Sequence, residues 1–199
     1  VSGFIEHSYE ELLEKHAKII TLGGDHAVTL PIIQAYEKHY PGLNLLQFDA
    51  HPDLYNELDG NRYSHACSFA RIMEEGLVKK LIQVGIRCMT RHQLEQAVRF
   101  NVTVVEMKSI PQDLSKLRFH GPLYVSIDLD ALDPAFAPGV SHLEPGGLCT
   151  RDLISVIQQI QAPIVGADIV EYNPTRDING MTAMVAVKLM KELAAKMLK

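Results

Sequence analysis

Short apolar runs alternate along the whole chain with segments that carry helix-start and helix-stop signals. We expect buried strands at residues 18–22, 43–48, 80–86, 102–107, 123–127 and 163–170. Helices are expected around them, at residues 8–18, 29–39, 64–75, 93–100, 152–161 and 182–199. This alternation is typical of a parallel sheet covered by helices on both faces. The sequence therefore predicts a single α/β domain over residues 1–199, with three α/β/α layers and a mainly parallel sheet.

The amino-acid composition argues against some classes of binding partner. The chain has 199 residues, of which 47% are hydrophobic, which is enough to bury one core. Its net charge of -5 and its lack of a long basic run argue against a nucleic-acid partner. No apolar stretch is long enough to cross a bilayer, and the N-terminus lacks a signal-peptide pattern. We expect a cytoplasmic protein with no membrane partner; an organelle is the alternative, since a first residue of Val1 suggests that upstream sequence is not represented.

The three cysteines form no local metal or disulfide motif. Cys67, Cys88 and Cys149 are widely separated and make no CxxC pair. We therefore expect a reducing compartment and neither a zinc knuckle nor a disulfide framework.

One stretch places three potential metal ligands directly after an apolar run. The expected strand at 43–48 leads into Asp49-Ala50-His51-Pro52-Asp53. Residues two apart in an extended backbone project from the same face, so Asp49 and His51 would point one way, as would Asp53 if the extension continues. Core packing does not explain these groups, because they would repel or stay unpaired unless a cation or hydrogen-bond network held them.

Other ionisable residues also follow predicted strands. The carboxyl ends of parallel strands lie along one edge of a sheet, and ligands bind there. The residues that fall on this edge are His26, Asp49, His51, Asp53, Asp128, Asp130 and Glu171. Two divalent cations would neutralise the charges of the four aspartates, and the six aspartate and histidine side chains can serve two metals if some carboxylates bridge. Carboxylate and imidazole ligands without thiolate suit Mn²⁺, with Fe²⁺, Co²⁺ or Zn²⁺ as substitutes. A two-metal site supplies hydroxide at neutral pH, so we expect hydrolytic chemistry.

Three motifs resemble those of the ureohydrolases, the family of arginase, agmatinase and related guanidino hydrolases. They are Gly23-Gly24-Asp25-His26, Asp49-Ala50-His51-Pro52-Asp53 and Ser126-Ile127-Asp128-Leu129-Asp130. The resemblance covers nearly the whole chain from Ile19 onward and is strongest to agmatinases and plant-type arginases. It implies an arginase-like fold and a homotrimer or homohexamer. Ureohydrolases also share a substantial segment before the first motif, so the resemblance implies that the domain lacks its N-terminal part.

The resemblance assigns a role to each site residue. One manganese ion would be held by His26, Asp49, Asp53 and Asp128, and the other by Asp49, His51, Asp128 and Asp130. Asp49 and Asp128 would then bridge two Mn²⁺ ions, and a hydroxide between the ions would attack the guanidinium carbon of a small guanidino substrate. His65 matches the histidine that passes protons to the leaving amine. Glu171 matches the carboxylate that holds the substrate guanidinium.

Several acidic and histidine residues have simpler explanations when taken one at a time. An aspartate after a strand is usually a turn former or helix cap. We keep that interpretation for Asp25, Asp133, Asp168 and Asp177, with support of the metal ligands as the alternative for Asp25 and Asp168. His142 and Glu144 lie in a turn-rich loop and are expected to be solvated, unless that loop borders the substrate.

The open issue within the family is the tail of the substrate. Animal-type arginases resemble one another in an asparagine shortly after the second motif and a Ser-Gly-Asn-rich loop, whereas this chain has Leu54-Tyr55 and then Glu57, Asp59 and Asn61. This departure favours agmatine, with urea and putrescine as products, and arginine is the alternative because plant-type arginases share much of the pattern.

Two further functions compete with a ureohydrolase. A zinc deacetylase would need one metal and fewer ligands, so His26 and Asp53 argue against it. An inactive metal-binding fragment or assembly subunit is the alternative that is not an enzyme, motivated by the short segment before Gly23. A nucleotide-binding module is disfavoured, because Gly23-Gly24 lacks the GxGxxG spacing.

Overall fold

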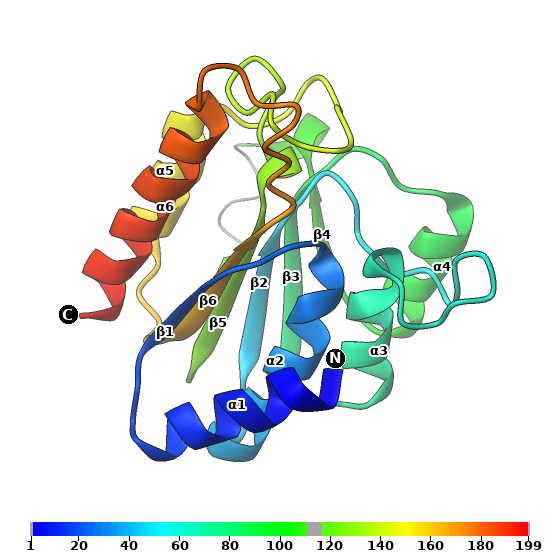
Figure 1. Ribbon diagram of the computed structural model, residues 1–199. Helices are drawn as coiled ribbons and strands as arrows, with labels where there is room; N and C mark the ends of the chain where they lie inside the picture. Colours follow the sequence, from blue (N-terminus) through cyan, green and yellow to red (C-terminus); the bar gives the residue numbers. More distant parts are fainter. Residues whose placement is uncertain (1, 111–116, 199) are drawn as a thin grey trace.

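The computed structural model describes residues 2–110 and 117–198 and contains a six-stranded sheet with helices on both faces (Figure 1). The strands are β1 Ile19–Leu22, β2 Asn44–Phe48, β3 Lys80–Ile86, β4 Thr103–Glu106, β5 Leu123–Asp128 and β6 Ile164–Val170. The α-helices are α1 Ser2–Glu14, α2 Thr29–His39, α3 Ser68–Glu74, α4 Arg91–Arg99, α5 Thr150–Gln159 and α6 Met181–Met197. This confirms the predicted three-layer α/β/α fold.

The strand order creates one switch point in the sheet. The order is β1-β6-β5-β2-β3-β4, and every neighbouring pair of strands is parallel. The chain runs outward from β2 through β3 to β4, then returns to β5 on the other side of β2. Ligands of open α/β sheets bind where the strand order reverses in this way. Because the register pairs Phe48 with Ile127, the next residues, Asp49 and Asp128, lie side by side at the carboxyl edge of the sheet.

Each face of the sheet has its own hydrophobic core. Helices α5 and α6 cover one face through residues such as Leu153, Ile157 and Leu189. Helices α1, α2 and α3 cover the other through residues such as Ile33 and Phe69. All of β2 is buried between these layers. The segment 49–53 therefore follows a strand that is buried on both faces of the sheet.

The first helix differs from its predicted position. It spans Ser2–Glu14 rather than residues 8–18, so Ser8 lies inside it and does not cap it. Ile5, Tyr9 and Leu13 recur every four residues and pack together against α2, which extends the helical face toward the N-terminus. The helix ends before His16, whose φ of 57° is left-handed. Similarly, the helix expected at 64–75 is a 3-10 turn, His65–Cys67, followed by α3.

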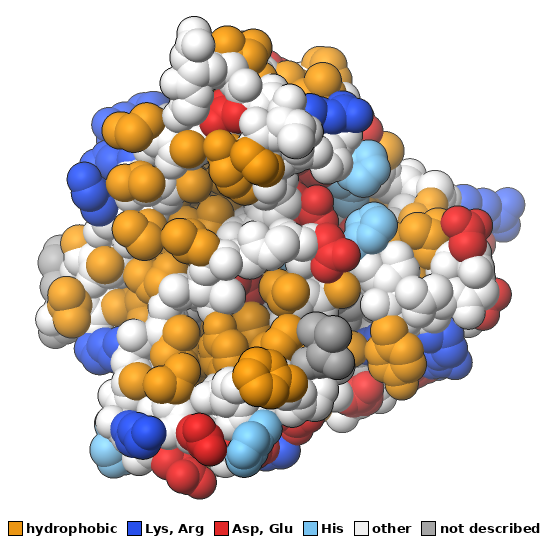
Figure 2. Space-filling model, in the orientation of Figure 1, with side chains coloured by type: hydrophobic (Ala, Val, Ile, Leu, Met, Phe, Trp, Pro, Cys, Tyr) orange, Lys and Arg blue, Asp and Glu red, His pale blue; other side chains and the backbone are white. Residues whose placement is uncertain are grey.

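One face of the molecule (Figure 2) shows how side chains of different types are distributed over the surface. Apolar side chains are spread over much of the face in Figure 2, and acidic and histidine side chains lie next to one another in its upper right part as well as along its lower edge. Among the described residues, no helix is both long enough and apolar enough to span a membrane.

Candidate metal centre

The six predicted metal ligands lie together at the switch point between β2 and β5. His26 opens a 3-10 turn after β1, the segment 49–53 follows β2, Asp128 ends β5, and Asp130 lies in the turn Leu129–Ala131. All except His51 are buried. The expectation that one sheet edge gathers these side chains is confirmed.

Three carboxylates surround the imidazole of His26. Its Nδ1 atom lies 3.1 Å from Oδ2 of Asp49, 3.2 Å from Oδ2 of Asp53 and 3.3 Å from Oδ2 of Asp128. This nitrogen is buried and makes no aligned hydrogen bond with any of them. A buried nitrogen facing three carboxylate oxygens without a hydrogen bond is the arrangement expected of ligands that converge on a cation.

A second group of ligands surrounds His51. Its Nδ1 atom lies 3.0 Å from Oδ2 of Asp130 and 3.5 Å from Oδ1 of Asp49. Asp49 therefore presents Oδ2 to the first group and Oδ1 to the second. Ligand atoms of His26, Asp49 and Asp53 lie within 4.8 Å of one another, and so do those of Asp49, His51 and Asp130.

Both groups fit a divalent cation, and their carboxylate and imidazole atoms suit Mn²⁺. Asp49 has the geometry of a bridging carboxylate between two such ions. Asp128 reaches only the first group directly, since its Oδ1 accepts a hydrogen bond of 2.8 Å from the backbone N–H of Asp130. A bridging role for Asp128 stays a prediction.

We expected Asp53 to point the same way as Asp49 and His51 only if the backbone after β2 stayed extended. The backbone does not stay extended. The strand ends at Phe48, and Asp53 has a left-handed φ of 49°. A turn, rather than alternation along a strand, brings Asp53 beside His26. Glu171 after β6 also has a left-handed φ, of 63°. Non-glycine residues rarely adopt this conformation, and such strain is concentrated at functional sites.

The charges in the cluster shift its proton equilibria. Burial lowers the pKa of His26, but the carboxylates of Asp128, Asp49 and Asp53 outweigh that effect and raise it well above its ordinary value. Burial likewise opposes the carboxylates of Asp130 and Asp49, which together raise the pKa of His51 to about 12. Burial and the negative charge of Asp49 raise the pKa of Asp53 to about 7. Protons therefore partly neutralise the cluster when no cation does so.

A buried relay behind His26 fixes the orientation of its ring. Ser126 donates a hydrogen bond of 2.6 Å to Asp168, so its oxygen must accept the 2.9 Å hydrogen bond from Nε2 of His26. The hydrogen on Nε2 leaves the Nδ1 lone pair of the neutral ring facing the carboxylates. Thr29 and Tyr124 also donate to Asp168, at 3.0 and 3.1 Å.

The interpretation of Asp168 as a turn former or cap is wrong. It lies inside β6, opposite Ser126 in the register, and is fully buried. It hydrogen-bonds to Ser126, which hydrogen-bonds to His26, and these contacts agree with its alternative role as a support of that expected metal ligand. Asp25, in contrast, caps the turn that begins at His26, as expected. Asp133 and Asp177 accept backbone hydrogen bonds in turns, also as expected.

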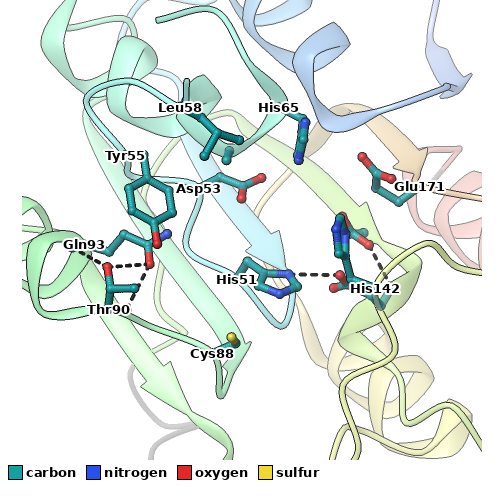
Figure 3. A pocket seen from close by; sticks show the side chains of 13 residues that line it. His51, Asp53, Tyr55, Leu58, His65, Cys88, Thr90, Gln93, His142 and Glu171 are labelled. Atoms are coloured by element: carbon teal, nitrogen blue, oxygen red, sulfur yellow. Dashed lines mark hydrogen bonds and ion pairs between the residues drawn. The ribbon is translucent and has the colours of Figure 1, made fainter. Parts of the chain in front are cut away.

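A pocket opens over the metal ligands. His65 and Glu171 line it together with His51, Asp53 and Asp128 (Figure 3). Oε1 of Glu171 accepts a hydrogen bond of 2.9 Å from the backbone N–H of His26, which ties the two elements together.

The turn-rich loop after β5 also borders the pocket. The ring of His142 stacks at 6.1 Å from that of His65 and at 5.7 Å, edge-on, from that of His51. Cys88, Thr90 and Gln93 complete the opposite wall, which no local motif in the sequence indicates.

Comparison with known proteins agrees with this geometry. The model of the Arginase family matches residues 2–195. The chain belongs to the arginase family. It is 50% identical over 194 residues to arginase 1, mitochondrial, of Arabidopsis thaliana, covering 94% of this chain and 57% of that protein. It is 36% identical to the N(1)-aminopropylagmatine ureohydrolase of Thermus thermophilus, over 92% of this chain and 67% of that protein.

A solved member of the arginase family has the same fold. The arginase from Medicago truncatula superposes with a TM-score of 0.93 at 46% identity, covering 98% of this chain and 65% of that one. The chain thus spans between half and two thirds of the length of these plant arginases. The resemblance predicted from the three motifs is confirmed, as is the arginase-like fold.

We predict that Asp168→Asn weakens manganese binding by about 10- to 100-fold, because an amide cannot accept all three hydrogen bonds and the His26 tautomer is no longer fixed. Titration calorimetry with Mn²⁺ measures the affinity. Asp25→Asn is the matched control, since asparagine also caps a helix turn. Ser126→Ala tests the same relay without altering a buried charge. Unchanged affinity in folded Asp168→Asn and Ser126→Ala variants would contradict the relay.

We also predict that metal binding releases protons and strengthens as pH rises. The raised pKa values of His26, His51 and Asp53 mean that these groups hold protons near pH 7, and a cation must displace them. Release of about one proton per cation is expected. Calorimetry at one pH in two buffers of different ionisation enthalpy measures it. Binding heats that do not depend on the buffer would show that the cluster is already deprotonated.

Proposed function

We propose that the protein to which this chain belongs is a manganese-dependent ureohydrolase, which converts a small guanidino compound to urea and an amine. One observation carries the proposal: two imidazole–carboxylate groups share Asp49 at the base of a pocket that His65 and Glu171 also line. A pair of divalent cations in these groups, when bound, lowers the pKa of water and supplies hydroxide at neutral pH.

The ligands divide between the two ions. His26 and Asp53 would hold one Mn²⁺, while His51 and Asp130 would hold the other. Asp49 would serve both, with Asp128 as the second bridge. The presence of two complete groups argues against the one-metal site of a deacetylase.

Glu171 is suited to hold the guanidinium group. Its carboxylate is fixed by the N–H of His26, a ligand of the first group, so the substrate carbon would be placed relative to the metals. A carboxylate can accept two parallel hydrogen bonds from a planar guanidinium. The pocket lining also includes Asp53, Asp128 and Asp130, and none of the described lining residues is a lysine or arginine. This lining favours a cationic substrate.

His65 is suited to deliver the proton that the reaction requires. Attack on the guanidinium carbon expels an amine, which leaves only after it gains a proton. An imidazole can carry a proton near neutral pH, and His65 faces the pocket from the turn before α3. Its neighbour His142 is exposed and lies near the rings of both His65 and His51.

Arginine is the substrate we propose, because the relatives from Arabidopsis thaliana and Medicago truncatula are both called arginases. Agmatine is the second candidate. It is favoured by the loop at residues 54–61 and by the lack of a basic residue in the described pocket lining, since the α-carboxylate of arginine would have no cationic partner there.

Location and assembly are further parts of the proposal. The name of the Arabidopsis relative places that protein in mitochondria, which favours the organellar alternative over the cytoplasm. We propose a homo-oligomer, a trimer or hexamer, as the family resemblance implies. An inactive fragment remains the competing function, because the chain spans 57% of that relative.

Urea release from arginine and from agmatine, with and without added Mn²⁺, tests the proposed function. We expect manganese-dependent release that is faster with arginine. Asp128→Asn is the control, expected to lose activity and manganese together because it removes a shared negative charge from both ions. Release from agmatine alone would reverse the choice of substrate. Release by a longer form containing this chain, with none by this chain alone, would support the inactive fragment, and no release by either form would contradict the proposed function.

A further inference from the structure

A second set of potential ligands lies on the outer side of His51. A ring nitrogen of His51, Sγ of Cys88 and a carboxylate oxygen of Glu144 lie within 4.8 Å of one another. Oε1 of Glu144 is 3.6 Å from Nε2. In Figure 3, Cys88 is on the opposite side of the His51 ring from His65. We refer to His51, Cys88 and Glu144 as the outer triad.

The outer triad comes from three segments that are fastened to one another. The backbone N–H groups of Arg87 and Cys88 both donate to the carbonyl oxygen of Ala50, at 3.0 Å, which fixes Cys88 beside His51. The guanidinium of Arg87 donates to the carbonyl oxygen of Glu144 through Nε, at 3.0 Å, and Nη2, at 2.6 Å. Arg87 also donates to the carbonyl oxygen of Asp130, at 2.7 Å.

These contacts hold the backbones of the three segments in place before any ion binds. The backbones that carry Cys88 and Glu144 are fixed to the segments that carry His51 and Asp130. Ligands placed by rigid neighbours lose little conformational entropy when they bind. The three ligand atoms lie within 4.8 Å of one another. A small movement of the side chains toward one another would let them coordinate an ion tetrahedrally, with one position left open.

The chemistry of the triad differs from that of the inner cluster. The inner ligands are carboxylates and imidazoles, whereas the triad adds a thiolate, which prefers softer ions than Mn²⁺. We propose that His51, Cys88 and Glu144 form a separate site for a thiophilic divalent cation such as Zn²⁺, Co²⁺ or Cd²⁺. Binding there displaces the thiol proton of Cys88 and the proton on the ligating nitrogen of His51, and the thiolate and Glu144 carboxylate balance the two charges of the ion.

The position of the triad makes it an inhibitory site. Neutral His51 has a single lone pair, which Nδ1 offers to the inner group or Nε2 offers to the triad. A cation in the triad therefore competes with the second manganese ion for His51. His51 and Cys88 also line the pocket, so the same cation would narrow its mouth.

Cobalt absorption tests the outer triad independently of urea release. Cobalt bound to thiolate has a strong charge-transfer band in the near ultraviolet, which cobalt bound only to oxygen and nitrogen lacks. We expect Co²⁺ added to the reduced, metal-free chain to produce this band, Cys88→Ser to abolish it and Glu144→Gln to weaken it.

Cys149→Ser is the matched control. Cys149 caps α5 through its side chain, a role serine also fills, so this variant should fold and keep the band. Circular dichroism confirms that each variant is folded. The proposal is overturned if the wild-type chain shows no thiolate band, if folded Cys88→Ser retains it, or if Cys149→Ser loses it.

Discussion

The carboxylate of Asp49 is the group on which the rest of the site depends. It follows the fully buried strand β2, and its two oxygens face two different imidazoles, those of His26 and His51. The parallel register of β2 and β5 brings Asp128 to its side. Burying several carboxylate charges away from bulk solvent costs free energy unless cations or protons compensate the charges. The raised pKa values of the neighbouring acids express that cost, and a pair of divalent ions would remove it.

A buried amide network holds Asp49 in this position. Gln47 donates a hydrogen bond of 2.7 Å to Oδ2 of Asp49, and the backbone N–H of His51 donates one of 2.6 Å to Oδ1. Gln83, beside Gln47 in the sheet, donates to the oxygen of Gln47 and to the carbonyl of Pro52. Two polar side chains inside central strands would be costly if unpaired. Here they fix both the carboxylate of Asp49 and the turn that leads to Asp53.

The sequence predicted the strands, the layers and the clustering of the six candidate ligands, because each signal is local: an apolar run, then ionisable residues at its carboxyl end. It could not predict contacts set by strand order. Asp168 resembles many aspartates of turns until β6 is placed beside β5 and opposite Ser126. Cys88 and Glu144 meet His51 only because Arg87 joins distant segments. The position of Asp53 was correct for a different reason, since a left-handed turn rather than extension places it.

The sharing of Asp49 between two metal ions is the central claim, and metal analysis of two variants tests it most directly. Manganese bound per chain would be counted in wild type, Asp49→Asn and Asp53→Asn under saturating conditions. The account predicts two ions in wild type, loss of the first ion in Asp53→Asn, and loss of both in Asp49→Asn. Retention of two manganese ions by folded Asp49→Asn would contradict it.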